Sequence, residues 1–358
     1  MYPTSKSADL TPEQIDRLDD TFFEANPASY WRARIDGLLR EPSPVDYFST
    51  LSAQVTGYGL DVRMLSGTEP TNTERELQRA LDAFALRHHL AESLVRLVHT
   101  LLFEDATARS SVWAALTTSP FKVKDVVDAL GAFDAKGEVP ATLFLPAAYT
   151  KALSADPPPD VVAGVLMHWR WVKRAMQVLV SEGLDANVGN NKLKHGLAVR
   201  PHSELRVAFM TEPPDTNGNV RLSAVQSGLD IIDAGSVEFL ERLPRTHEHG
   251  GSWEVSVLNL RPAPLIAEAL MLSTVWASAF AAAASNRFSG PEAARPKHPG
   301  LVLGPPPEAI VQEVVGLRQP LTISRKSGSW RGGLIETPTS TIQFEQTGTG
   351  TNGVIVDG

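Results

Sequence analysis

A long apolar stretch at residues 264–288 constrains the fold of this chain more than any other feature. It reads PLIAEALMLSTVWASAFAAAASNRF and carries a single acid, Glu268, before Arg287. A helix of this length could span a bilayer, but the stretch is rich in alanine and serine, and alanine adds little to membrane insertion. The sequence has no second run of this kind. We therefore expect a helix buried in a protein core and no membrane as a partner.

Two amphipathic segments are suited to cover such a helix. Residues 72–104 place Leu86, Leu90 and Leu94 on one side of a helical wheel, and residues 160–182 gather valine, methionine and leucine in the same way. The chain is therefore predicted to be mainly α, with a helical bundle at its centre. Shorter helices are predicted at residues 11–25, from there to about residue 65, at residues 109–135 and at about residues 184–199.

The hydrophobic period changes from near 3.6 to near 2 after Pro201. Turn-rich segments separate the apolar runs that follow, which favours an antiparallel sheet of three or four strands. The strands are predicted at residues 204–210 and 220–225, as a hairpin around PPDTNGN, and at residues 236–243 and 252–260.

These patterns predict an α+β chain with two parts. Residues 1–290 form a helical domain with a small antiparallel β insertion at about residues 203–262. Residues 291–358 are rich in proline, glycine and threonine and are expected to form a C-terminal extension. Within that extension, TGTGTNG has the composition of a flexible linker.

Composition and missing motifs exclude several classes of protein. The chain has no cysteine, which excludes disulfide scaffolds, zinc–thiolate sites, iron–sulfur clusters and a cysteine nucleophile. Its net charge of −8 argues against coating nucleic acid through bulk charge, although a small basic patch remains compatible. No Walker loop, GxGxxG, GxSxG, HExxH or EF-hand pattern occurs. We expect no cofactor, and the absence of a secretory signal favours a cytoplasmic protein.

Polar residues are densest in NVGNNKLKHGLAVRPH, residues 187–202. On a helix, Asn191 and His195 are i,i+4 neighbours on one face, and Lys192 and Lys194 flank it. Imidazole moves a proton near neutral pH, and lysine stabilises the charge of a phosphate. Metal-independent RNA cleavage needs such a set. The alternative is a solvated helix that ends in a glycine cap directly after the histidine.

This segment resembles the HEPN superfamily of helical bundles, many of whose members are RNA-cleaving toxins or antiviral effectors. The active-site pattern of that family is an arginine, a polar residue, three further residues and a histidine. Asn191 matches the polar position and His195 the histidine, while Asn190 stands where the family has arginine. Asparagine carries no positive charge, so cleavage would require Lys192 or Lys194 to substitute for the arginine.

The resemblance implies an RNA-associated protein whose site is Asn190, Asn191 and His195, with Lys192 and Lys194 contacting phosphate. Its helical pattern extends over about residues 72–200, and it implies a site formed across a homodimer. Degenerate members of such a family act as binding or regulatory subunits. The alternative is a non-enzymatic protein-interaction or regulatory subunit that binds another protein through its sheet and C-terminal extension.

Further candidates lie outside this segment. The opposite side of the helix at residues 72–104 is expected to be a polar face, and it could complete a site with His195 or be plainly exposed to solvent. His168, on an apolar face, is expected to be a hydrogen-bonded core histidine. His247 and His249 could share a face in an extended segment, but no third metal ligand is identifiable. The polar face of residues 72–104 consists of His88, Glu92, Arg96 and His99. A basic face, expected to be solvated or alternatively to contact RNA or a partner, consists of Arg170, Lys173 and Arg174.

Overall fold

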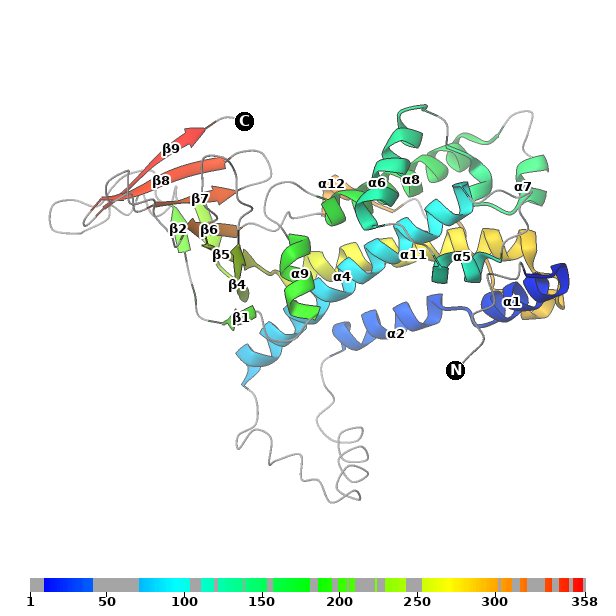
Figure 1. The fold of residues 1–358 in the computed structure, drawn as a ribbon, viewed down its shortest axis with the longest axis horizontal. Coiled ribbons are helices and arrows are strands. Elements are labelled where there is room, and N and C mark those ends of the chain that lie inside the picture. The colour runs from blue at the N-terminus through cyan, green and yellow to red at the C-terminus, as the bar shows by residue number, and fades with distance from the viewer. Residues whose placement is uncertain are drawn as a thin grey trace, which may run out of the picture. The chain divides into compact units, whose positions relative to one another are not determined.

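The chain forms helices and strands that divide between two compact units in a computed structural model (Figure 1). The first unit holds Met1–Ile35, Leu86–Val180 and Ala267–Ile310, and the second holds Asp36–Ala85, Ser181–Ile266 and Val311–Gly358. The structure describes residues 10–40, 71–103, 111–118, 122–137, 139–152, 157–180, 186–194, 199–203, 205, 207–209, 223, 229–242, 253–301, 304–310, 316–320, 332–336, 341–347 and 350–356.

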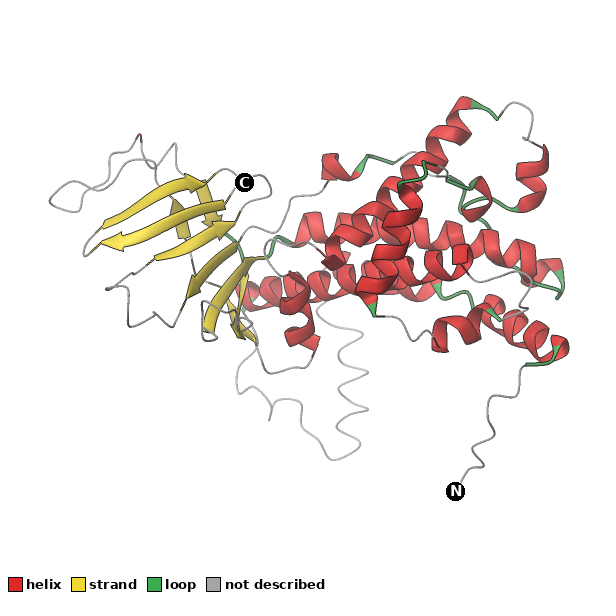
Figure 2. Ribbon diagram, turned by 45° about the horizontal axis from the view of Figure 1, so that its top comes forward, coloured by secondary structure: helices red, strands yellow, loops and turns green. Residues whose placement is uncertain are grey.

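Every regular element among the described residues of the first unit is a helix (Figure 2). Its first helix, α1 (Pro12–Glu24), begins with a capping box, in which the Gln14 amide donates to the Thr11 hydroxyl (3.3 Å) and the Thr11 amide donates to Gln14 Oε1 (2.8 Å). The helices that follow, some of which reach into the second unit, are α2 (Ala28–Leu39), α4 (Asn72–Phe103), α5 (Val112–Thr118), α6 (Val123–Asp134), η2 (Ala141–Leu143), α7 (Ala147–Ala152), α8 (Pro159–Val180), α11 (Pro262–Arg287), η3 (Glu292–Ala294) and α12 (Pro307–Ile310).

The apolar helix α11 runs through the core of the first unit, as its sequence predicts. Leu272 and Phe280 have no exposed surface. The Phe280 ring stacks on Trp276, with centroids 4.9 Å apart, and it also meets Phe22 and Phe23 of α1 at 5.3 and 5.1 Å. Such aromatic contacts stabilise the core beyond the area that they bury.

Among the described residues, α11 is the one helix long and apolar enough to cross a membrane. Within its most apolar window, 83% of the residues are buried inside the protein itself. A helix whose surface is already covered by other helices has little left to offer to lipid. The burial therefore accounts for its hydrophobicity without a bilayer.

The second unit contains an antiparallel sheet (Figure 2). Within the described residues its seven strands follow the order β1-β4-β5-β6-β7-β8-β9, and β2 and β3 form a separate antiparallel pair. Ile231 and Ile232 of that pair pack with Val257 of the sheet in a small apolar cluster. The strands are β1 (Val199–His202), β2 (Val207–Phe209), β3 (Leu229–Ile232), β4 (Ser236–Arg242), β5 (Trp253–Asn259), β6 (Gly316–Pro320), β7 (Gly332–Glu336), β8 (Thr341–Thr347) and β9 (Gly350–Val356).

The predicted fold class is confirmed: the chain is mainly α, with a helical bundle and an antiparallel sheet. The long helices and the strands β4 and β5 lie where the hydrophobic periods predict them. The sheet is larger than the predicted insertion, because β6 to β9 come from the C-terminal segment and extend the same sheet from the edge of β5. An unpaired strand edge exposes backbone hydrogen-bonding groups, and β6 satisfies those of β5.

Local differences from the prediction cluster around this sheet. The helix predicted to reach about residue 199 ends at Lys194 within the described residues, and Val199 already belongs to β1. The predicted partner of β2 at residues 220–225 lies mostly outside the described residues, and β2 pairs with β3 instead. The linker-like TGTGTNG contributes its ends to the β8–β9 hairpin, with Thr347 opposite Gly350.

Candidate functional site

The helix α9 (Ala186–Lys194) carries the asparagines and lysines of the HEPN-like pattern, and it belongs to the second unit. Ala186, Gly189 and Asn190 are buried, and their i, i+3, i+4 spacing defines one face of the helix. This face packs against β1 and β4. The remaining faces carry Asn187 and Lys192, which are half-buried, and Asn191 and Lys194, which are exposed.

A close approach between α9 and the sheet requires glycine at position 189. A Cβ added there would lie 3.0 Å from both Leu258 Cδ1 and Phe239 Cε1, closer than side chains normally pack. Leu258 and Phe239 are themselves buried, on β5 and β4. The orientation of α9 is therefore fixed by the packing of one face, and the faces that carry Asn191 and Lys194 point away from that contact.

Asn190, at the arginine position of the family pattern, lies on the packed face. Only 6% of the residue is exposed, and its Oδ1 is buried without a hydrogen-bond donor. A buried acceptor that finds no partner costs roughly 1–3 kcal/mol. The position is therefore directed at the sheet, whereas the neighbouring Asn191 is directed at solvent.

His195 and the residues up to 198 lie outside the described residues. Lys192 and Lys194 fall in the last turn of α9, where cations favour the negative end of the helix dipole. On β1, the first strand of the sheet order, the Arg200 guanidinium lies 3.6 Å from Glu238. Lys192, Lys194 and Arg200 lie within nine positions of one another in the sequence. The Glu238 carboxylate that Arg200 approaches also lies 3.3 Å from Nε2 of His202.

The predicted polar face of α4 belongs to the first unit, whereas α9 belongs to the second. That face is less exposed than the helical wheel predicts: His88 is buried and Glu92, Arg96 and His99 are half-buried. Neighbouring helices cover α4 on more than one side, which an amphipathic pattern does not reveal. Glu92 and Arg96 form an ordinary i,i+4 ion pair at 2.9 Å.

His168 of α8 is a hydrogen-bonded core histidine, as its position on an apolar face predicts. Its Nδ1 lies 2.9 Å from the Gly164 carbonyl oxygen, and its Nε2 lies 3.2 Å from Ser278 Oγ of α11. Burial lowers the pKa of His168 to about 4, against the opposing effect of the Gly164 carbonyl. The imidazole is therefore neutral at pH 7 and joins two helices rather than exchanging protons with solvent.

The basic face predicted on α8 is solvated in part: the Arg170 and Lys173 side chains are each 44% exposed, and all three cations of the face make ion pairs. Arg170 bonds Glu308 of α12 at 2.6 Å, and Lys173 lies 3.6 Å from Asp134 of α6. Arg174 is largely buried and bonds Glu268 of α11 at 2.7 Å. The three cations therefore tie α8 to three other helices, because each finds a carboxylate on a different neighbour.

A buried ionic triad is the main polar feature that the periodicity did not predict. Glu268 accepts from Arg174 through Oε1 and from Arg87 of α4 through Oε2, the latter at 3.3 Å, and both Arg87 and Glu268 are 2% exposed. Burial lowers the pKa of the Arg87 guanidinium, and the Glu268 carboxylate opposes this shift. The signals for the triad were a lone acid in an apolar run and an arginine at the edge of a leucine face.

Within the part of the chain that the structure describes, no group of histidine, aspartate and glutamate side chains could hold a metal ion. The residues His247 and His249 lie outside that part.

No protein-family model, no curated protein and no solved structure matches this chain.

Proposed function

We propose that this is a HEPN-like, RNA-associated protein that binds through the exposed faces of α9 without cleaving its ligand. The observation that carries the proposal is the burial of Asn190 next to the exposure of Asn191 and Lys194 on one short helix. The residue type that would stabilise a transition-state charge is replaced by a neutral amide, and its position faces the sheet. The polar and basic positions remain available to solvent.

The chemistry of the exposed residues suits phosphate contact. Lys194 is exposed and Lys192 is half-buried, and lysine neutralises a phosphate as a compact point charge. Asn191 adds amide donors beside them. Contacts of this kind position a nucleic acid without reading its sequence. Because the whole chain carries a net charge of −8, the attraction is local and is expected to weaken steeply with salt.

RNA binding tests this proposal directly. We expect single-stranded RNA to bind at low salt in fluorescence anisotropy, and the double variant Lys192→Gln/Lys194→Gln to bind at least about tenfold more weakly, since two phosphate contacts are lost. The matched control, Lys122→Gln/Lys136→Gln, removes the same charge from exposed positions on either side of α6 and should bind like the wild type. An equal loss of RNA affinity in both double variants would show that only net charge matters, and it would overturn the proposed binding site on α9.

Cleavage is tested separately, in EDTA, with the wild type beside His195→Ala and Asn190→Arg. We expect none of the three to degrade RNA, because a guanidinium introduced at position 190 would face the sheet rather than a bound phosphate. Degradation by the wild type that disappears in His195→Ala would overturn the non-catalytic part of the proposal. It would instead support a metal-independent ribonuclease of the toxin or defence type.

The proposal includes self-association, because HEPN-like sites form across a dimer. Light scattering after size exclusion should give twice the mass of one chain. A monomer that binds no RNA would leave the alternative, a non-enzymatic subunit that interacts with another protein.

A further inference from the structure

The chain that follows α11 and η3 is held on the helical core of the first unit by hydrogen bonds. We call the described residues between 296 and 310 the strap. Toward its end, the Trp171 indole donates to the Pro305 carbonyl at 3.2 Å, and Arg170 bonds Glu308 at 2.6 Å. Both Trp171 and Arg170 belong to α8, so the second half of the strap is fastened to that helix.

A single histidine fastens the first half of the strap. The turn at His298, Pro299 and Gly300 brings the Gly300 amide back to the imidazole, where it donates to Nδ1 at 3.0 Å. Gly300 has a φ of +85°, which residues with side chains rarely adopt. On the other side of the ring, Nε2 lies 2.6 Å from the carbonyl oxygen of Phe144, the residue that follows η2. The imidazole is therefore bonded at both nitrogens, once within the strap and once to the core.

These two contacts define the protonation state of His298. A carbonyl oxygen only accepts, so Nε2 carries the proton, and a backbone amide only donates, so Nδ1 carries none. A proton added at Nδ1 would set two N–H groups against each other and would place a charge on a half-buried ring. The closed strap therefore needs the neutral imidazole.

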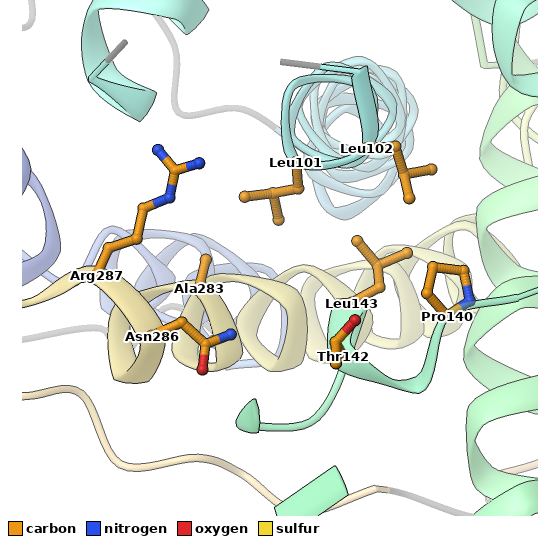
Figure 3. Close-up of a pocket in the computed structure, with 8 residues that line it drawn as sticks. All are labelled: Leu101, Leu102, Pro140, Thr142, Leu143, Ala283, Asn286 and Arg287. Atoms are coloured by element: carbon orange, nitrogen blue, oxygen red, sulfur yellow. The ribbon is translucent and has the colours of Figure 1, made fainter. Parts of the chain in front are cut away.

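The Phe144 carbonyl belongs to a segment that is itself held on the core. Asn286 of α11 accepts from the Ala147 amide through Oδ1 at 2.9 Å. Leu143, one residue before Phe144, is buried and lies across a cleft from Leu101 of α4, with α11 as the remaining wall (Figure 3). The acceptor for His298 is thus fixed by neighbouring helices, and the strap is the partner that can detach.

The strap also packs closely on α8. A Cβ added to Gly164 would lie 2.9 Å from Leu301 Cβ, so the strap reaches this helix because position 164 has no side chain. The Gly300 carbonyl oxygen lies 3.4 Å from Ser278 Oγ of α11, and the same hydroxyl lies 3.2 Å from His168 Nε2. Loss of the His298 contacts would therefore loosen Gly300 and Leu301 together.

The described groups around His298 do not favour a positive charge on its ring. Residues 139–147, which supply the carbonyl acceptor, have no ionisable side chain. The strap turn meets α11 at the neutral Ser278, and α8 contributes His168, whose pKa His298 lowers. The strap itself adds Lys297, an exposed cation. Burial lowers the pKa of His298, against the opposing effect of the Phe144 carbonyl.

We propose that the strap is an acid-sensitive latch, which is closed on α8 while His298 is neutral and opens at residues 297–301 when the ring is protonated. Proton uptake at Nδ1 replaces an accepted hydrogen bond by two opposed donors, which is a local change of the kind that drives histidine switches. The residues of the latch all belong to the first unit, so the inference does not depend on the proposed RNA contact of α9.

Hydrogen exchange of the full chain at pH 7 and pH 5, corrected for intrinsic exchange rates, tests the latch. The open strap binds more protons than the closed one, so closing is favoured above the ordinary histidine pKa of 6.5 and weakens as the pH falls below it. Protection of residues 297–301 should fall by at least about threefold and at most about 25-fold, the limit for one such histidine. Residues 276–284, inside α11, should change by less than about twofold, because the opening is local. Unchanged protection of residues 297–301 in the wild type would overturn the inference.

Histidine variants identify the group that titrates. His298→Gln gains no proton, yet its amide can still donate to the Phe144 carbonyl, so protection of the strap should be nearly the same at pH 7 and pH 5. His202→Gln, the matched control in the second unit, should respond to pH like the wild type, and so should His168→Gln. A wild-type response in His298→Gln would contradict the latch. A response that disappears in His168→Gln would assign the titration to that residue instead.

Gly164→Ala tests the latch without altering a titratable group. Its methyl group would meet Leu301, so the strap should already be open at pH 7, with protection of residues 297–301 lowered at least about threefold and little further change at pH 5. Equal protection in Gly164→Ala and the wild type would show that the strap does not close on α8 as the distances indicate.

Discussion

His168 shows how a single polar residue is accommodated in the helical core. Its two ring nitrogens meet the Gly164 carbonyl and the Ser278 hydroxyl, and the side chain is 1% exposed. Among the titratable groups around it, His298 opposes its protonation, and burial also lowers the pKa of His298 itself. His298 Nε2 lies 2.6 Å from the Phe144 carbonyl oxygen, and the Phe144 ring lies 5.3 Å from that of His168. Both imidazoles therefore favour the neutral form.

The lowered pKa of His168 predicts sensitivity to acid. The unfolded chain has an ordinary histidine pKa near 6.5 and the folded chain one of about 4. Between these values the unfolded state binds more protons than the folded state. The contribution of His168 to the free energy of unfolding is therefore complete above this window and is lost as the pH drops through it. The loss for this one group is on the order of 3 kcal/mol by pH 4.

Urea unfolding between pH 7 and pH 4 measures this loss. His168→Gln should show a smaller pH dependence than the wild type, although it is less stable at pH 7. Identical pH dependence in His168→Gln and the wild type would contradict the assignment.

At the scale of elements, close packing orients α9 on its sheet. Gly189 allows the helix to approach β4 and β5, and Gly189→Ala would bring a methyl group to 3.0 Å from two buried side chains. We expect this substitution to destabilise the second unit by about 1–3 kcal/mol, because overpacking forces its neighbours to shift.

Gly37→Ala is the matched control. Gly37 lies within α2, and a Cβ added there meets nothing within 4 Å, so alanine should stabilise the helix by roughly 0.5–1 kcal/mol. Thermal unfolding of both variants checks the pair. A neutral Gly189→Ala would mean that α9 does not pack as closely as the distances indicate.

The triad of Arg87, Glu268 and Arg174 joins α4, α11 and α8 through one buried carboxylate. Glu268→Gln should cost about 3–5 kcal/mol, because two cations that are largely buried lose their common counter-charge. Replacing the triad together, as Arg87→Met/Glu268→Leu/Arg174→Met, should cost far less, since no unpaired charge remains.

Asp36→Asn, in an exposed i,i+4 pair with Arg40, should change stability by less than about 0.5 kcal/mol. Denaturant unfolding measures all three, and a Glu268→Gln as mild as Asp36→Asn would contradict the buried pairing.

At the scale of the whole molecule, distant parts of the chain complete one sheet. The strand β5 pairs with β4 on one side and with β6, which begins at Gly316, on the other. Residues 311–358 therefore belong to the second unit, whereas residues 291–310 of the predicted extension belong to the first.

Truncation tests this role. Removing residues 316–358 should expose the backbone edge of β5, lower the Tm and cause aggregation, because an unpaired edge is a template for further pairing. Removing only residues 350–358 takes away β9, the last strand in the order, and should have a smaller effect. Size-exclusion chromatography and thermal unfolding distinguish the two. A monomeric, equally stable chain without residues 316–358 would show that these strands do not support β5.

The sequence alone determined the helical class, the long helices, and the strands β4 and β5. A helix or strand that is buried on one side has apolar residues at its own structural repeat, and this hydrophobic period is visible in the local sequence, as in the leucines of α4. It also determined that α11 must be buried and that His168 lies in a core.

Tertiary structure decided how many sides of each element are covered and which distant segments meet. No local pattern reports that His88 is buried, that Asn190 faces a sheet, or that β6 pairs with β5, since each depends on a neighbour far along the chain. The cleft between α4, η2 and α11 has the same origin: its leucines, Asn286 and Arg287 are unremarkable in the sequence, and only the packing of three helical segments brings them together.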